Sequence, residues 1–151
     1  MEDALSSPMD LALALAEEAA AAGEAPVGAV IVENGQLLAA ERNRMRELAD
    51  PTAHAELLAI RAALLQRGSG RLDGCDLYVT LEPCAMCAGA IAHSRLRRVC
   101  YAAEDAKGGA VDNGVRLFAS PTCHHRPEVI AGIGETRATV LLKSFFAGLR
   151  S

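Results

Sequence analysis

The chain is poor in aromatic residues: its 151 residues include no Trp, two Tyr and three Phe. This scarcity excludes an extended surface of interleaved basic and aromatic side chains. The chain also lacks an uninterrupted apolar run of about 18 residues, so we expect no membrane span. The apolar stretch 11–22 contains Glu17 and Glu18 and has no basic leader. It therefore does not fit a signal peptide.

An excess of positive charge is also missing. Lys and Arg total 15 against 19 Asp and Glu, which gives a formal net charge of −4. Indiscriminate binding to nucleic acid is therefore not expected, because such affinity depends on neutralising many phosphates. The length and a hydrophobic content of 51% are those of an ordinary globular protein. We expect a single domain over residues 1–151.

The five cysteines do not form the two pairs of a zinc ribbon. Cys84 and Cys87 are three positions apart, whereas Cys75, Cys100 and Cys123 are scattered. A redox pair remains an alternative for the Cys-x-x-Cys motif alone. Reduced cysteines fit a cytoplasmic location better than an oxidising compartment.

A second group of metal-binding residue types precedes this pair. His54 and Glu56 lie two positions apart, ahead of Cys84 and Cys87. One His and two Cys supply three zinc ligands, and three protein ligands leave a fourth position for water. Alone, His54 could be a capping or core residue and Glu56 a solvated charge. Together the four residues favour a catalytic zinc site, with Glu56 free for proton transfer.

Both motifs lie at expected helix starts. Residues 50–52 offer capping residues and a proline ahead of the apolar run 57–65, and Pro83 suits a first helical position. We expect each motif in the first turn of its helix, where the positive end of the helix favours thiolate. The metal would then lie between two helix starts.

Periodicity and turn signals predict alternating strands and helices. The expected helices cover about 10–22, the stretch from the His54 motif to near 68, 83 to about 93, and 135–149. The expected strands cover 27–32, 36–41, 76–80, 98–102 and 128–133, with a hairpin turn at Asn34-Gly35 and a functional loop over 108–127. This order indicates a three-layer α/β/α sandwich, with the motifs at one edge of the sheet.

The pattern His-x-Glu followed by Pro-Cys-x-x-Cys resembles the signature of the zinc-dependent cytidine and deoxycytidylate deaminase superfamily. The resemblance runs from about Pro26 to Phe146, and residues 105–110 with the tandem Phe145-Phe146 are similar to its bacterial tRNA adenosine deaminase branch. It implies a cytidine-deaminase-like fold with a mixed five-stranded sheet, one Zn²⁺ per subunit and a homodimer. The implied activity is hydrolytic deamination of adenosine to inosine at the wobble position of a tRNA anticodon.

The resemblance also implies residue roles. Zinc, held by His54, Cys84 and Cys87, would activate water, and Glu56 would shuttle protons. The substrate contacts would be the Ala55 backbone N–H and the Pro83 region beside the base, Asn43 on the purine or ribose, Val27 on the pocket wall, Asp105 and Lys107 on the anticodon loop, and Phe145 as a stacking residue.

Several of these residues also have plain structural interpretations. Val27 fits core packing, Asn43 fits a loop cap, and at least one Phe of the tandem fits the core. The same zinc and Glu56 would also serve a deaminase of a free base or nucleoside, of the guanine or cytosine type. Lys107 and the basic segment 124–126 favour a polyanionic substrate. A non-enzymatic relative is a third possibility, against which the presence of Glu56 argues.

Overall fold

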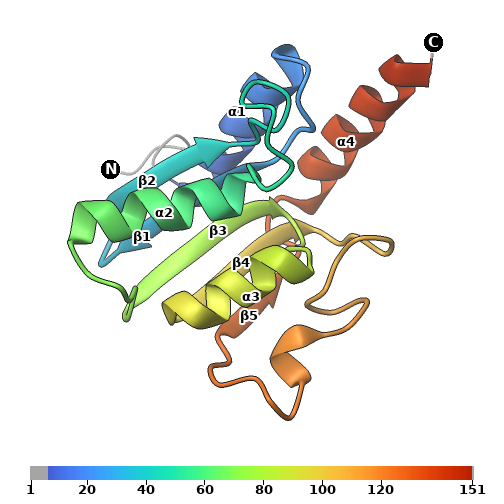
Figure 1. Ribbon diagram of the computed structural model, residues 1–151. Coiled ribbons are helices and arrows are strands. Elements are labelled where there is room, and N and C mark those ends of the chain that lie inside the picture. Colours follow the sequence, from blue (N-terminus) through green and yellow to red (C-terminus); the bar gives the residue numbers. More distant parts are fainter. Residues whose placement is uncertain (1–6, 151) are drawn as a thin grey trace.

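Five strands form one mixed sheet in the computed structural model, which describes residues 7–150 (Figure 1). The strands are β1 (Gly28–Glu33), β2 (Gln36–Arg42), β3 (Cys75–Leu81), β4 (Arg98–Ala103) and β5 (Glu128–Ala131). Their order is β2-β1-β3-β4-β5. β1 is antiparallel to β2 and β3, whereas β3, β4 and β5 are parallel. The expected mixed sheet is confirmed; the expected domain limits also include residues 1–6 and 151, which lie outside the described part.

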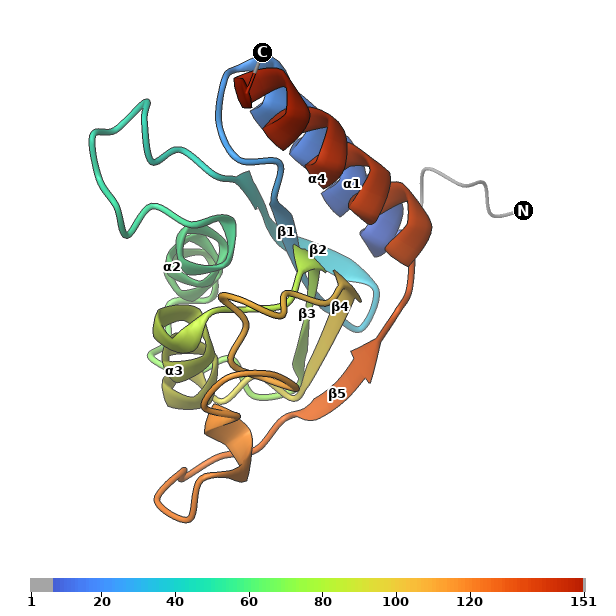
Figure 2. The same cartoon turned by 90° about the vertical axis from the view of Figure 1, so that its right-hand side faces the viewer.

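Helices cover both faces of the sheet (Figure 2). They are α1 (Pro8–Ala21), α2 (Ala55–Arg67), α3 (Ala85–Ser94) and α4 (Glu135–Arg150), with a short 3₁₀ helix at Leu117–Ala119. α2 and α3 lie on one face, and α1 and α4 lie on the other. The three-layer α/β/α arrangement expected from the sequence is therefore confirmed. Within residues 7–150, no helix combines the length and apolarity that a membrane span requires.

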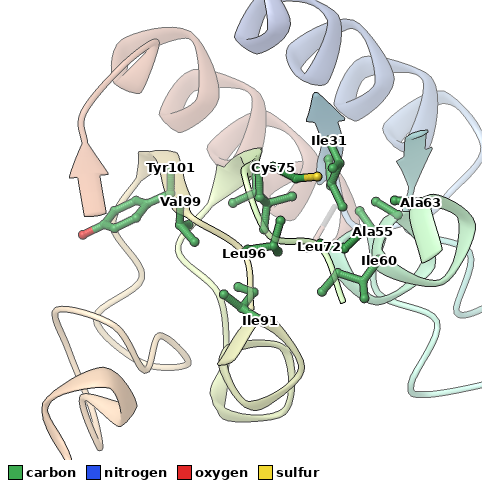
Figure 3. Close-up of a cluster of buried hydrophobic side chains, with 14 of the residues drawn as sticks. Ile31, Ala55, Ile60, Ala63, Leu72, Cys75, Ile91, Leu96, Val99 and Tyr101 are labelled. Carbon is green, nitrogen blue, oxygen red and sulfur yellow. The ribbon is translucent and has the colours of Figure 1, made fainter. Parts of the chain in front are cut away.

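The alternation of side chains along β1 explains the three layers. Ala29 and Ile31 pack in the cluster shared with α2 and α3, part of which Figure 3 shows. Val30 and Val32 pack in the second cluster, with α1. Successive residues of a strand point to opposite faces, so one strand with a buried pattern on both faces demands cover on each side.

One edge of the sheet gathers the segments that carry the motifs. Because β1 runs antiparallel to β3, the residue before β1, Val27, lies at the same edge as Leu81, the last residue of β3. Gly28 permits α1 to approach this edge, since a Cβ there would lie 2.0 Å from the Ala12 carbonyl oxygen. α3 follows β3 directly, so its first turn also begins at this edge.

Candidate functional site

Three donor atoms from two helix starts meet in one cluster. His54 is the N-cap of α2, Cys84 is the N-cap of α3, and Cys87 lies in the first turn of α3. His54 Nδ1 lies 3.7 Å from Cys84 Sγ and 3.6 Å from Cys87 Sγ, and all three donors lie within 4.8 Å of one another. In a tetrahedral zinc site the normal Zn–S and Zn–N lengths separate S and N by about 3.6 Å. The donor set therefore fits zinc in both chemistry and spacing.

The helix context differs from the expectation by one residue. Cys84 has an extended backbone, with φ −76° and ψ 176°, and caps α3 from outside the helix. Pro83 consequently precedes the cap, and our placement of Pro83 at the first helical position was wrong. His54 caps α2 in the same extended conformation, so it too precedes the first turn in which we expected it. His54 and Cys84 thus lie just ahead of their helices, and the metal position still lies between two helix starts.

Glu56 lies beside the cluster without belonging to it. Within residues 7–150, no fourth His, Cys, Asp or Glu joins the three-donor group. The Glu56 carboxyl interacts with the thiol of Cys87, and the residue is only 4% exposed. Burial raises the pKa of Glu56 to about 7. A carboxyl with such a pKa can both accept and donate a proton near neutrality.

The two thiols differ in acidity. The pKa of Cys84 is lowered to about 3, because its sulfur accepts a hydrogen bond from Cys87 and another from His54. The pKa of Cys87 is raised, because it donates to Cys84 and is buried. The contact with Cys84 also raises the pKa of His54. A divalent metal bound to both sulfurs would displace the Cys87 proton, so metal binding is coupled to proton release.

Asn43 acts as a cap, which was the structural interpretation of this residue from the sequence. Its Oδ1 accepts a hydrogen bond of 2.8 Å from the Ala55 backbone N–H, which caps the start of α2. This N–H therefore has a partner within the protein, in place of the base that we expected it to hold. Asn43 is itself only 5% exposed, and its N–H donates to the Val27 carbonyl. The hydrogen bond between Asn43 and Ala55 ties the loop after β2 to the start of α2.

A groove of about 750 Å³ opens at the same edge of the sheet. Its lining includes three of the expected substrate residues: Val27, Asp105 and Lys107. Val27 also belongs to the main core cluster, so it serves as both groove wall and core residue. Asp105 Oδ1 accepts from the backbone N–H groups of Lys107 and Gly108, at 3.1 and 2.9 Å, and so shapes its own turn.

The tandem phenylalanines of α4 line two different hollows, although their rings touch edge to face with the centroids 5.3 Å apart. Phe146 lines the groove and is 44% exposed. Phe145 lies instead in a shallow hollow beside Ala20 and Ala21 of α1. Consecutive helical residues point about 100° apart, so only one of the two can face the groove. We expected Phe145 to be the stacking residue, but Phe146, and not Phe145, lines this groove.

Glu82 is a residue that the sequence analysis overlooked. It is 2% exposed, and its carboxylate accepts hydrogen bonds from the loop that follows β4. These N–H donors lower its pKa even though burial alone would raise it. The Pro83 carbonyl next to it accepts from the Ala110 N–H at 2.9 Å. A charged residue between a buried strand and a metal ligand was the signal that could have revealed it.

Comparisons with known proteins agree with this geometry. A family model described as the cytidine and deoxycytidylate deaminase zinc-binding region matches residues 3–103. The chain is 53% identical over 138 residues to the tRNA-specific adenosine deaminase of Agrobacterium fabrum, with 91% of each chain covered. A structure from studies of A-to-I editing by tRNA:A34 deaminases at the wobble position is 52% identical, with a TM-score of 0.88, and the match covers 89% of this chain and 98% of that one. The guanine deaminase of Nitrosomonas europaea is 28% identical, with a TM-score of 0.77, over 97% and 87% of the two chains.

Proposed function

The chain belongs to the cytidine and deoxycytidylate deaminase zinc-binding family, and from that premise we propose that it hydrolyses adenosine to inosine and ammonia at the wobble position of a tRNA anticodon. The observation that carries the proposal is the three-donor metal cluster with the buried, uncoordinated carboxyl of Glu56 beside it. The substrate class is supported by the two relatives that are 53% and 52% identical to the chain, whose names refer to tRNA adenosine deamination.

One Zn²⁺ per subunit would be held by His54, Cys84 and Cys87. When bound, the ion supplies a water molecule acidic enough to act as a nucleophile near neutral pH. At its carboxylate oxygen, Glu56 would accept one proton of the attacking water and pass it to a purine ring nitrogen. It would then accept the remaining proton of the added oxygen and pass it to the exocyclic nitrogen, so that the C–N bond breaks, ammonia leaves and the oxygen becomes the inosine carbonyl. Its burial keeps both protonation states accessible for this transfer.

Other groups orient the nucleotide. Asn43 Oδ1 is held by the Ala55 N–H, which leaves its amide N–H groups as donors for the purine or the ribose. Ala55 therefore acts through Asn43, and Pro83 supports the wall beside the metal. Asp105 and Lys107 line the groove, where an ammonium group and backbone amides suit the backbone of a single-stranded loop.

Deamination of a free base is the second candidate, because the fold matches a guanine deaminase with a TM-score of 0.77.

Purified protein loaded with zinc should convert the wobble adenosine of an anticodon stem-loop to inosine, measured by mass spectrometry of the digested RNA. Free guanine, cytosine and adenosine should be turned over far more slowly. Rapid turnover of a free base, with an unmodified stem-loop, would contradict the tRNA assignment.

Phe146→Ala should raise the KM for the stem-loop about tenfold, because one stacked base contributes about 1–3 kcal/mol. Its kcat and the thermal stability of the protein should change little, since the ring is 44% exposed. Phe145→Ala is the matched control on the same helix: it should lower the melting temperature and leave KM near the wild-type value. Steady-state kinetics and thermal melts of both variants test this division. The reverse result would return the stacking role to Phe145.

The protein acts as a homodimer in the cytoplasm. A groove of about 420 Å³ between α3 and the segment 115–124, with the apolar side chain of Val115 exposed along it, supports contact with a second copy. The reduced state of all five cysteines is compatible with the location. Light scattering coupled to size-exclusion chromatography measures the oligomeric state directly, and a monomer at micromolar concentration would contradict the dimer.

A further inference from the structure

We propose that Glu82 is a positioning residue that sets the wall of the substrate groove. Its buried carboxylate, at the end of β3, holds both ends of the segment 105–113, which carries Asp105 and Lys107. The inference rests on the proposed function for its kinetic consequence, but the contact itself is a property of the fold. Glu82 neither belongs to the metal cluster nor lines the groove.

Each carboxylate oxygen of Glu82 holds a different part of the segment. Oε1 accepts from the Asp105 backbone N–H at 3.0 Å and from Asn113 Nδ2 at 2.7 Å. Oε2 accepts from the backbone N–H groups of Val111, Asp112 and Asn113 at 3.0, 2.8 and 3.0 Å. An anion with five donors around it is fully paired, and its hydrogen bonds are of the strong, charge-assisted kind. The Glu82 carboxylate therefore clamps the two ends of the segment 105–113 to one point.

The same loop is shaped to admit this carboxylate. A Cβ at Gly109 would lie 2.4 Å from Glu82 Cδ and 2.5 Å from the Asp105 carbonyl oxygen. Any side chain at position 109 would push the loop and the carboxylate apart. Ala110 adds a third tie, because its N–H donates to the Pro83 carbonyl. The loop is thus joined to the residues immediately before Cys84, and the groove wall is fixed relative to the metal.

Glu82→Gln tests the clamp with almost no change in volume. An amide offers one acceptor oxygen in place of two, while the backbone donors on both sides of it cannot turn away. Suppose that the Gln oxygen keeps the backbone N–H groups of residues 111–113. The Gln NH₂ group then faces the Asp105 N–H, which loses its acceptor. We expect the hydrogen-exchange protection of the Asp105 amide to fall about tenfold or more. The amides of α2 should be unaffected.

The kinetic result expected is a KM for the stem-loop raised about tenfold, with kcat within about threefold of wild type and one zinc per chain retained. Gly109→Ala should give the same split, because it displaces the loop from the opposite side. Glu128→Gln is the matched carboxyl-to-amide control: its carboxylate pairs with Arg98 at the other edge of the sheet, and it should not alter KM.

Two outcomes would overturn the inference. Unchanged exchange in Glu82→Gln at the Asp105 amide and also at the amides of Val111, Asp112 and Asn113 would show that the carboxylate does not hold the loop. A fall in kcat together with loss of zinc, at unchanged KM, would make Glu82 a support of the metal site instead. If the wild-type protein forms no inosine, the proposed function fails, but the exchange measurement still tests the clamp.

Discussion

Glu56→Ala is expected to lower kcat for inosine formation by at least roughly 10³-fold while zinc stays bound, because one carboxyl serves both as proton acceptor and as proton donor. Glu56 is outside the three-donor group, so the metal keeps its ligands. The protein should also keep its fold, since the substitution removes a buried acidic group whose ionised form burial disfavours. Single-turnover assays and metal analysis of the same preparation measure both quantities.

Glu56→Gln separates the loss of proton transfer from the loss of volume. It keeps the size of the side chain but cannot carry a proton at neutral pH, so we expect it to be as inactive as the alanine variant. Near-normal turnover by either variant, with full zinc content, would remove Glu56 from the proposed mechanism. A loss of zinc in Glu56→Gln would instead show that the residue supports the ligands.

Cys87→Ser has the second large expected effect: loss of zinc and of stability together. The metal binds the folded site and not the unfolded chain, so binding adds to the free energy of unfolding. At a free zinc concentration 1,000 times the dissociation constant this contribution is about 4 kcal/mol. Cys87 is fully buried, so the serine hydroxyl also lacks access to water. Zinc content and the urea midpoint should therefore fall together.

Cys100→Ser is the control for burying a serine. Cys100 is 2% exposed but belongs to the core cluster on the α1 side, away from the metal donors. The variant should lose some stability and keep one zinc per chain. Full zinc occupancy in Cys87→Ser, or loss of zinc in Cys100→Ser, would contradict the assignment of the ligands.

Features that depend on near neighbours in the chain were predictable. The spacing of His54 with Glu56 and of Cys84 with Cys87 indicated the metal site, and the expected helices and strands match the observed ones except near their ends. The exact helix start was missed at Pro83, because a proline fits both a first helical position and the residue before a cap. Only the extended backbone of Cys84 distinguishes the two.

Features that depend on distant segments were not predictable. The partner of the Ala55 N–H is Asn43, in the loop after β2. The partners of Glu82 lie in residues 105–113, and α3 and β4 separate them from Glu82 along the chain. Such pairs form only when packing brings the segments together, and nothing in the local pattern names them. A buried carboxylate predicts that partners exist without saying which they are.

The amino-acid sequence by itself determined the metal-binding residue types, the elements that present them and the order of strands and helices, because spacing and periodicity act over a few residues. Tertiary structure alone decided that Phe146, and not Phe145, faces the groove, and that Glu82 holds the groove wall. The physical reason is that the rotation of a helix about its axis and the path of a loop are set by what they pack against. Those contacts come from residues far away in the chain.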